Sequence, residues 1–379
     1  MANNNDNKVL NVPPLRFPEF TKEWEEHALA EYLDFKNGLN PDVKRIGRGL
    51  PFISVMDILA DGTINNDSIR GKVEATEREI ENFSVEKGDI LFQRSSETLE
   101  DVGRANVYMD NRTAVYGGFV IRGRKIGDYN PLFFKYLLST PLARKRTCRM
   151  GAGAQHFNIG QDGLSKISLC FPLMEEQNKI ARLLSLIDER IATQNKIIEK
   201  LQSLIKGLRV CCMQRNGSNN VYLSEIAQIY QPQTISSAEL TEDGFLVYGA
   251  NGIIGKYKDY NHKTEQICIT CRGNTCGMVN YTKPMSWITG NAMVINTDKY
   301  QDKVYKKYLY HYLSAYNFNS IISGSGQPQI VRTPLEKLKI TLPTISEQKQ
   351  KAMILDKVQD KIEINHNILN LYILQKQYL

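Results

Sequence analysis

A glycine-rich stretch in the second half of the chain has the composition of a phosphate-binding loop. It runs from Gly249 to Lys256, but five residues separate Gly249 from Gly255, where a phosphate loop has four. Tyr257 then stands where Ser or Thr should hold Mg²⁺. We therefore favour a glycine-rich turn between two strands, and a nucleotide-dependent enzyme remains the alternative.

Three of the seven cysteines, Cys268, Cys271 and Cys276, have the close spacing of half a zinc site. A structural zinc needs four ligands, usually from two such pairs, and the nearest histidine is His262, six residues before Cys268. Cysteines three apart on a strand also point to opposite faces. We favour buried or idle thiols over a zinc-dependent enzyme and predict no metal, no cofactor and no catalytic residues.

Composition bounds the class of protein. The 379 residues, with 42% hydrophobic and 23% charged side chains, suit two globular domains. No apolar run approaches the roughly 18 residues of a membrane span, and the polar N-terminus lacks a secretory signal. The odd number of cysteines favours a reducing, cytoplasmic location. The net charge of +7 permits a polyanionic partner without demanding one.

The chain repeats itself at a constant offset of 171 residues. The segments 153–177 and 324–348 match at Gly, Ile, Leu-x-Lys, Pro and Glu-Gln positions, and both 324 − 153 and 348 − 177 equal 171. An ungapped match of this length indicates two copies of one unit, each a globular part followed by a helix.

Long helices are predicted after each match, at 173–215 and 344–379, because apolar residues recur at alternating spacings of four and three. Each seam has one polar member, Gln194 or Asn365, again 171 apart. Buried amides at matched positions fix register, so we expect an antiparallel coiled coil between units related by a pseudo-twofold axis. The alternative is that each helix packs only on its own domain. The predicted seam consists of Ile180, Leu184, Ile187, Ile191, Gln194, Ile198, Leu201, Leu355, Val358, Ile362, Asn365 and Leu369.

The globular parts are predicted to be α/β domains. A helix precedes the repeated block in each, at 131–138 and 304–313. The polar turn 216–220 separates the copies. We expect a disordered arm at 1–13 and domains at 14–172 and 216–343. The expected strands are 50–55, 89–93, 114–121, 167–171, 244–248, 266–271, 287–295 and 338–342.

Several motifs together resemble one family. They are Pro14–Trp24, Gly88–Arg94, Leu246–Gly255, Ile288–Asn291 and the two Pro…Glu-Gln helix starts. Over nearly the whole chain, they look like the specificity subunit of type I restriction–modification systems. The resemblance implies two target-recognition domains, each reading half of a split, asymmetric DNA site, and two spacer helices that set the gap.

The resemblance also implies a subunit without catalytic activity. Its partners would be double-stranded DNA, two modification (methyltransferase) subunits and restriction subunits, with no membrane. The complex would be an adenine methyltransferase and endonuclease. A repeat adaptor that binds only protein is the alternative.

Candidate DNA contacts divide into phosphate contacts and base readers. Arg144, Lys145, Arg146 and Arg149 form the densest basic cluster, for which a solvated helix face is the alternative. Arg suits guanine, and Gln or Asn suits adenine. Any single reader could instead be an ordinary loop residue. The proposed readers, in polar loops after strands and after the Gly-x-Gly turns, are Arg94, Ser95, Ser96, Arg104, Gln155, His156, Asn158, Arg272, Asn274, Thr275, Gln327 and Gln329.

Overall fold

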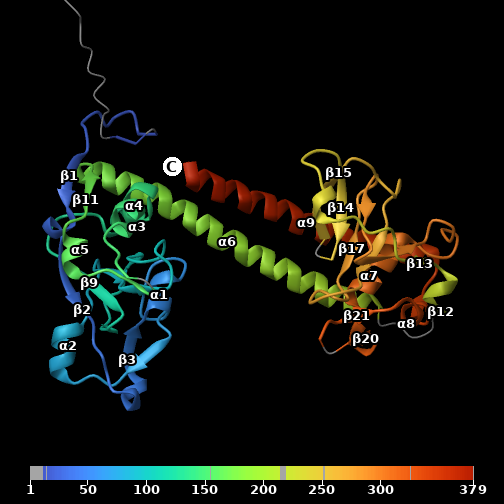
Figure 1. Ribbon diagram of the computed structural model, residues 1–379, viewed down its shortest axis with the longest axis horizontal. Helices are drawn as coiled ribbons and strands as arrows, with labels where there is room; N and C mark the ends of the chain where they lie inside the picture. Colours follow the sequence, from blue (N-terminus) through green and yellow to red (C-terminus); the bar gives the residue numbers. More distant parts are fainter. Residues whose placement is uncertain are drawn as a thin grey trace, which may run out of the picture. The chain divides into compact units, whose positions relative to one another are not determined.

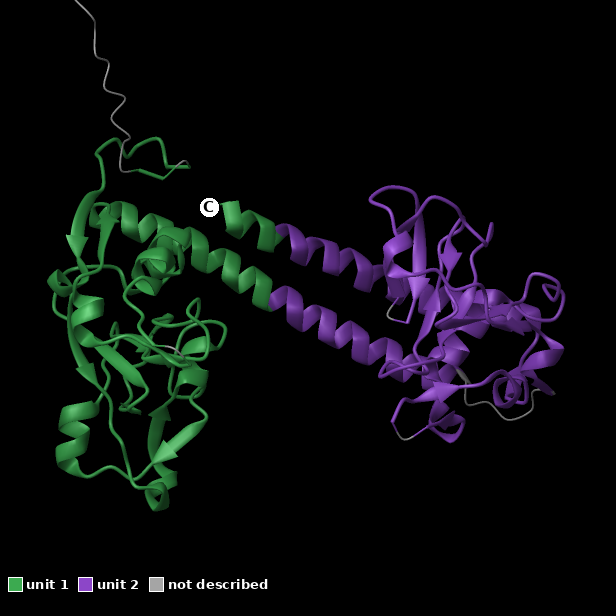
Figure 2. Cartoon of the chain, in the orientation of Figure 1, with its two compact units in different colours: residues 1–192, 372–379 green, residues 193–371 purple. Residues whose placement is uncertain are grey.

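The computed structural model describes residues 12–13, 15–153, 155–213, 219–250, 252–324 and 326–378 (Figure 1). The chain divides into two compact units: unit 1 comprises residues 1–192 and 372–379, and unit 2 comprises residues 193–371 (Figure 2). Most of the arm expected at 1–13, and most of the turn at 216–220, fall outside the described residues. Within the described ranges, no helix has the length and apolar character needed to cross a membrane.

Unit 1 is built on a four-stranded and a three-stranded sheet, with two short strand pairs. The four-stranded sheet has the order β2 (Leu33–Asn37), β9 (Val120–Lys125), β5 (Ile90–Gln93), β7 (Ala105–Val107). The three-stranded sheet has the order β4 (Gly71–Val73), β3 (Ile46–Ile53), β8 (Val115–Tyr116). The short pairs are β1 (Glu25–Ala28) with β11 (Ser168–Phe171) and β6 (Ser95–Ser96) with β10 (Phe157–Asn158).

Unit 2 repeats this architecture. Its four-stranded sheet has the order β13 (Gln228–Tyr230), β19 (Ala292–Asn296), β16 (Ile267–Thr270), β17 (Val279–Tyr281). Its three-stranded sheet has the order β15 (Gly252–Tyr257), β14 (Phe245–Gly249), β18 (Trp287–Ile288). The short pairs are β12 (Asn219–Tyr222) with β22 (Lys339–Leu342) and β20 (Ile322–Ser323) with β21 (Gln329–Ile330).

The strand order therefore corresponds sheet by sheet, and even the mixed pairing recurs. β8 pairs parallel with β3 in unit 1, and β18 pairs parallel with β14 in unit 2, while the other named pairs are antiparallel. The repeat seen in the sequence is thus a repeat of topology as well.

Two of the expected strands are each broken into two. The runs 114–121 and 287–295 leave the three-stranded sheet and enter the four-stranded sheet, with the change at Gly117-Gly118 and at Gly290-Asn291. A Cβ at Gly290 would lie 2.3 Å from Thr234 Oγ1, so the chain passes where only glycine fits. An apolar run shows that both ends are buried but does not show this change of sheet.

Short helices flank the sheets, and two long helices complete the units. The helices of unit 1 before residue 174 are α1 (Val55–Leu59), α2 (Glu77–Phe83), α3 (Pro131–Ser139), α4 (Pro141–Cys148) and α5 (Gln161–Ser165). Those of unit 2 are α7 (Lys306–Ala315) and α8 (Arg332–Glu336). The long helices are α6 (Met174–Met213) and α9 (Ile345–Tyr378), each with residues in both units (Figure 2).

Each long helix is bonded to its preceding domain by a buried glutamine of the repeated Glu-Gln motif. Gln177 on α6 donates to Pro172 O (3.0 Å) and accepts from Asn130 N (3.0 Å), at the start of α3. Gln348 on α9 donates to Pro343 O (2.9 Å) and accepts from Tyr305 N (2.8 Å), at the start of α7. The same side chain thus fixes the same helix–helix junction in both units.

Within unit 2, the α6 segment from residue 193 and the α9 segment up to residue 371 run antiparallel. In unit 2, α6 residues 201, 205, 208 and 212 pack with Leu355, Val358 and Ile362 in one apolar cluster. Nearer the N-terminus of α6, Gln194 donates to the backbone oxygen (3.1 Å) and the side-chain oxygen of Asn365. In unit 1, Lys376 Nζ lies 2.5 Å from Asp188 Oδ1. Each of these contacts lies within one unit, and none of the predicted seam residues is exposed.

Candidate nucleic-acid interface

Each unit has a tight glycine turn within the repeated block. Gly153 has a φ of 147° and Gly324 a φ of 89°, both in the region that side chains disfavour. A Cβ would lie 1.9 Å from His156 O at the first turn and 2.6 Å from Gln327 O at the second. The two turns therefore require glycine, and they leave Gln155, His156 and Gln327 exposed.

In unit 1, the turn brings two of the predicted readers together from distant parts of the sequence. Ser95 in β6 lies opposite Asn158 in β10, and Ser95 Oγ donates to Asn158 Oδ1. These residues are 63 positions apart. We call Ser95 and Asn158 the unit-1 pair.

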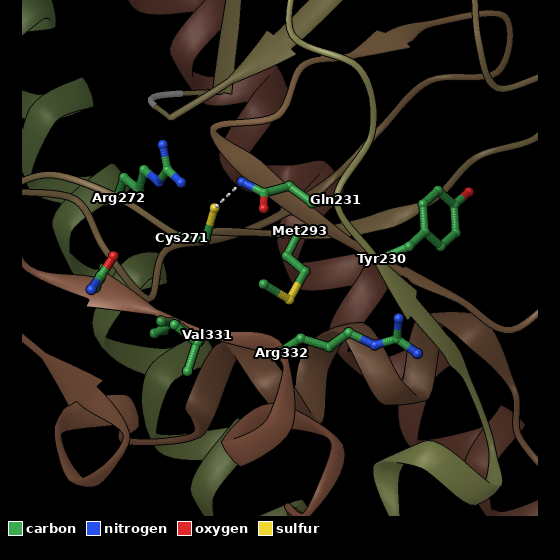
Figure 3. A pocket seen from close by; sticks show the side chains of 9 residues that line it. Tyr230, Gln231, Cys271, Arg272, Met293, Val331 and Arg332 are labelled. Atoms are coloured by element: carbon green, nitrogen blue, oxygen red, sulfur yellow. Dashed lines mark hydrogen bonds between the residues drawn. The ribbon is translucent and has the colours of Figure 1, made fainter.

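In unit 2, the corresponding bridge joins Arg272 to Gln329. Both side chains are exposed and line a pocket of about 350 Å³ (Figure 3). Arg332, at the start of α8, adds a second guanidinium to this pocket. We call Arg272 and Gln329 the unit-2 pair.

The two pairs occupy the same place in the fold. The residue before the first member, Arg94 or Cys271, accepts a backbone hydrogen bond of 3.0 Å from the residue after the second member, Ile159 or Ile330. Arg94 and Cys271 also follow directly on equivalent strands, β5 and β16. One backbone frame therefore presents serine and asparagine in unit 1 but arginine and glutamine in unit 2.

The basic cluster on α4 divides into two kinds of side chain. Arg144 donates to the carbonyls of Glu100, Val102 and Gly103 at 2.7 to 2.9 Å, and burial lowers its pKa. Arg146 forms an ion pair with Glu26 (2.6 Å). Lys145 and Arg149 are exposed. Phosphate contact stays a prediction for all four, and the geometry favours Lys145 and Arg149.

The other predicted readers hold neighbouring loops or face solvent. Asn274 is exposed. The remaining contacts are Arg94 to Gly118 O (3.3 Å), Ser96 Oγ with Thr98 N (3.2 Å), Arg104 with Asp101 (2.8 Å) and Thr275 Oγ1 to Ala250 O (3.1 Å).

Two pocket residues, Gln231 and Arg332, were not among the predicted readers. Gln231 Nε2 donates to Cys271 Sγ (3.6 Å) and to Gly290 O. Arg332 lies three residues after Gln329, within the repeated block. This position in the sequence could have identified it as a candidate reader. No sequence pattern could have identified Gln231, because it follows β13 and is distant in sequence from Cys271 and Gly290, to which it bonds.

The cysteines and the glycine-rich loop were the alternative sites considered from the sequence. Cys268 is buried in β16 and Cys271 follows that strand, and burial raises the pKa of both thiols. In the ranges that the structure describes, no three His, Cys, Asp or Glu residues are grouped to hold a metal. The glycine-rich stretch is the antiparallel turn from β14 to β15, not a loop opening a helix. The turn between strands predicted from the sequence is confirmed.

Comparison with known proteins identifies the family. The model of the type I restriction modification DNA specificity domain matches residues 21–203 and again 216–371. The chain belongs to this family. Its members supply DNA specificity and are not themselves catalytic, which settles the enzyme alternative on family grounds.

Individual relatives agree with the family match. The putative specificity subunit of type I restriction enzyme MjaX from Methanocaldococcus jannaschii is 25% identical over 403 residues, covering 94% of this chain and 92% of that protein. The EcoprrI specificity subunit from Escherichia coli is 32% identical over 140 residues, 36% of this chain and 34% of that protein.

Solved structures share the fold. The S subunit of the type I restriction–modification system from M. genitalium superposes with a TM-score of 0.69 at 16% identity, over 96% of both chains. A chain from a study of complex assembly and conformational transition of the type I R-M system has a TM-score of 0.53 at 14% identity, covering 96% of this chain and 97% of that one.

Proposed function

We propose that this specificity subunit reads a bipartite, asymmetric duplex site, with one half-site for each unit. The observation that carries the proposal is that the unit-1 and unit-2 pairs share a backbone frame but differ in chemistry. An Arg–Gln pair offers five guanidinium donors and an amide, suited to guanine and adenine edges. A Ser–Asn pair has no charge and a shorter reach, so the two half-sites should differ in sequence.

The proposed domains are those predicted from the sequence: target-recognition domains at 14–172 and 216–343 and spacer helices at 173–215 and 344–379. The helices form an antiparallel coiled coil, and the copies are related by a pseudo-twofold axis. The Gln194–Asn365 hydrogen bond supports this arrangement. Equivalent residues of two copies touch each other only close to a twofold axis, and these two are 171 apart, the repeat offset.

The proposed partners follow from the family. In the cytoplasm, the subunit would bind double-stranded DNA and recruit two modification subunits, to make an adenine methyltransferase, and restriction subunits. Lys145 and Arg149 would contact phosphates of the first half-site, because both are exposed, Lys145 on α4 and Arg149 directly after it, in the segment that leads to the Gly153 turn. The remaining predicted readers would add further contacts to DNA.

Mapping methylated adenines tests the proposal. A host without other adenine methyltransferases expresses this chain with its modification subunits, and single-molecule sequencing gives the methylated sites. We expect one split site with unlike halves. Arg272→Ala should relax one half-site, and Ser95→Ala combined with Asn158→Ala should relax only the other.

Each variant is the control for the other half-site, because both leave the scaffold glutamines intact. An undivided methylated site would refute the bipartite proposal. So would variants of the two pairs that relax the same half.

A further inference from the structure

One exposed phenylalanine of unit 1 lies in a turn that is hydrogen-bonded to the residue before the unit-1 pair. Phe119 is 69% exposed, whereas Val115, Tyr116, Val120 and Ile121 around it are fully buried. It lies in the turn where the chain passes from β8 to β9. Among the described residues with large exposed apolar side chains, it is the only phenylalanine.

Hydrogen bonds fix this turn against the strand that carries the pair. Phe119 O accepts from Arg94 N (2.9 Å), and Arg94 Nη1 donates to Gly118 O (3.3 Å). Arg94 directly precedes Ser95, so Phe119 is on the strand position next to the unit-1 pair. The position of its Cα is therefore set by the same frame that sets Ser95 and Asn158.

Unit 2 has a residue at the equivalent position. Asn291 O accepts from Cys271 N (3.0 Å), and Cys271 directly precedes Arg272. Asn291 is also exposed. Each unit thus has an exposed side chain opposite the residue that precedes its pair: an aromatic ring in unit 1 and an amide in unit 2.

Resting on the function proposed above, we infer that Phe119 contacts DNA by inserting its ring against the bases of the first half-site and unstacking a base step, and that Asn291 occupies the matching position in the second. Apolar side chains inserted between base steps are a known way to deform duplex DNA, and aromatic rings stack on bases of any sequence. Ser95, which pairs with Asn158, directly follows the residue opposite Phe119, and the turn after Gly153 exposes Gln155 and His156. This polar, hydrogen-bonding surface matches a groove better than it matches a protein interface, whose centre is apolar.

The test uses the chain assembled with its modification subunits and a duplex carrying its mapped site. 2-Aminopurine is placed at successive positions of the first half-site, because its fluorescence rises when the base is unstacked. Wild-type complex should raise the fluorescence at one step. Phe119→Ala should abolish that rise and weaken binding by about 5- to 150-fold, the range for loss of one stacking contact.

The salt dependence of binding separates stacking from phosphate contact. Phe119→Ala should leave the slope of log Kd against log salt unchanged, because no phosphate contact is lost. Met56→Ala is the matched control, since Met56 is 63% exposed in α1, an element that carries neither member of the pair, and should change nothing. Asn291→Ala should weaken binding without changing fluorescence in the first half-site.

Two results would overturn the inference. One is unchanged affinity and fluorescence in Phe119→Ala. The other is release of the modification subunits by Phe119→Ala without DNA, measured by mass photometry, which would make Phe119 a protein contact. Failure of the proposed function would look different, because the wild-type complex would then show no preference for its mapped site.

Discussion

Replacing the buried glutamine at the start of α9 should destabilise unit 2 by about 2–4 kcal/mol. Gln348 is fully buried, and its amide forms hydrogen bonds with Tyr305 N (2.8 Å), Pro343 O (2.9 Å) and Lys303 O (3.1 Å). Each such bond contributes about 0.5–1.5 kcal/mol net, and its loss leaves a backbone group without a partner. Gln348→Ala removes all three and should lower the melting temperature of unit 2 by about 5–15 °C.

Hydrogen exchange gives the local readout, because thermal unfolding of a two-unit chain need not be two-state. In Gln348→Ala, the Tyr305 amide should exchange faster, while the Asn130 amide at the start of α3 should not. Gln177→Ala is the matched variant, and the pattern should reverse. It breaks two bonds, with Asn130 N and Pro172 O, so a cost of about 1–3 kcal/mol is expected. A cost below about 1 kcal/mol in both variants, with unchanged exchange, would refute the reasoning.

Three other perturbations test separate features. Lys145→Ala with Arg149→Ala should reduce the slope of log Kd against log salt by about 2, in filter-binding titrations, if each contacts one phosphate. An unchanged slope would show that neither side chain contacts a phosphate. Burial is the largest cause that lowers the pKa of His311 below its ordinary 6.5. Around and below this pH, the unfolded chain therefore binds a proton on His311 more readily than the folded chain does. The free energy of unfolding of unit 2 should therefore fall as pH drops below about 6.5, and less so in His311→Gln, by urea titration. Asn365→Ala should lower the free energy of unfolding by about 1 kcal/mol, because Gln194 loses one acceptor. Replacing both residues with Leu should keep the stability but allow more than one spacer length between half-sites in methylation maps.

The sequence predicted the scaffold well because the scaffold is what the repeat preserves. Gln177 and Gln348 stood out as matched residues, and both form the same buried junction. Gln194 and Asn365 stood out as polar members of two heptad seams, and they bond to each other. A long heptad pattern predicts a helix from residues that are close in sequence. The constant offset of 171 residues then predicts the equivalent helix and seam residues in the second copy.

The interface was predictable only as a set of separate loops. Ser95 meets Asn158, and Arg272 meets Gln329, through strand pairing between distant segments, which depends on the packing of the whole unit. The basic run on α4 could not reveal that Arg144 is engaged by carbonyls of the loop 100–103. Nor could the apolar run at 114–121 reveal the turn that exposes a phenylalanine.

Polar contacts join α3 in unit 1 and α7 in unit 2 to segments of both long helices. The unit-1 and unit-2 pairs take no part in these contacts. In unit 1, Lys376 on α9 binds Asp188 on α6, which also accepts a hydrogen bond from α3. In unit 2, His311 on α7 meets Asp356 on α9 at 3.0 Å and accepts from Arg209 on α6 at 3.3 Å. Hydrogen bonds are directional, so these contacts set the orientation of each domain on its helices more tightly than apolar packing alone would. The loops that carry the pairs form none of these bonds, so under the proposed function their side chains could change the bases read while the helices stay as they are.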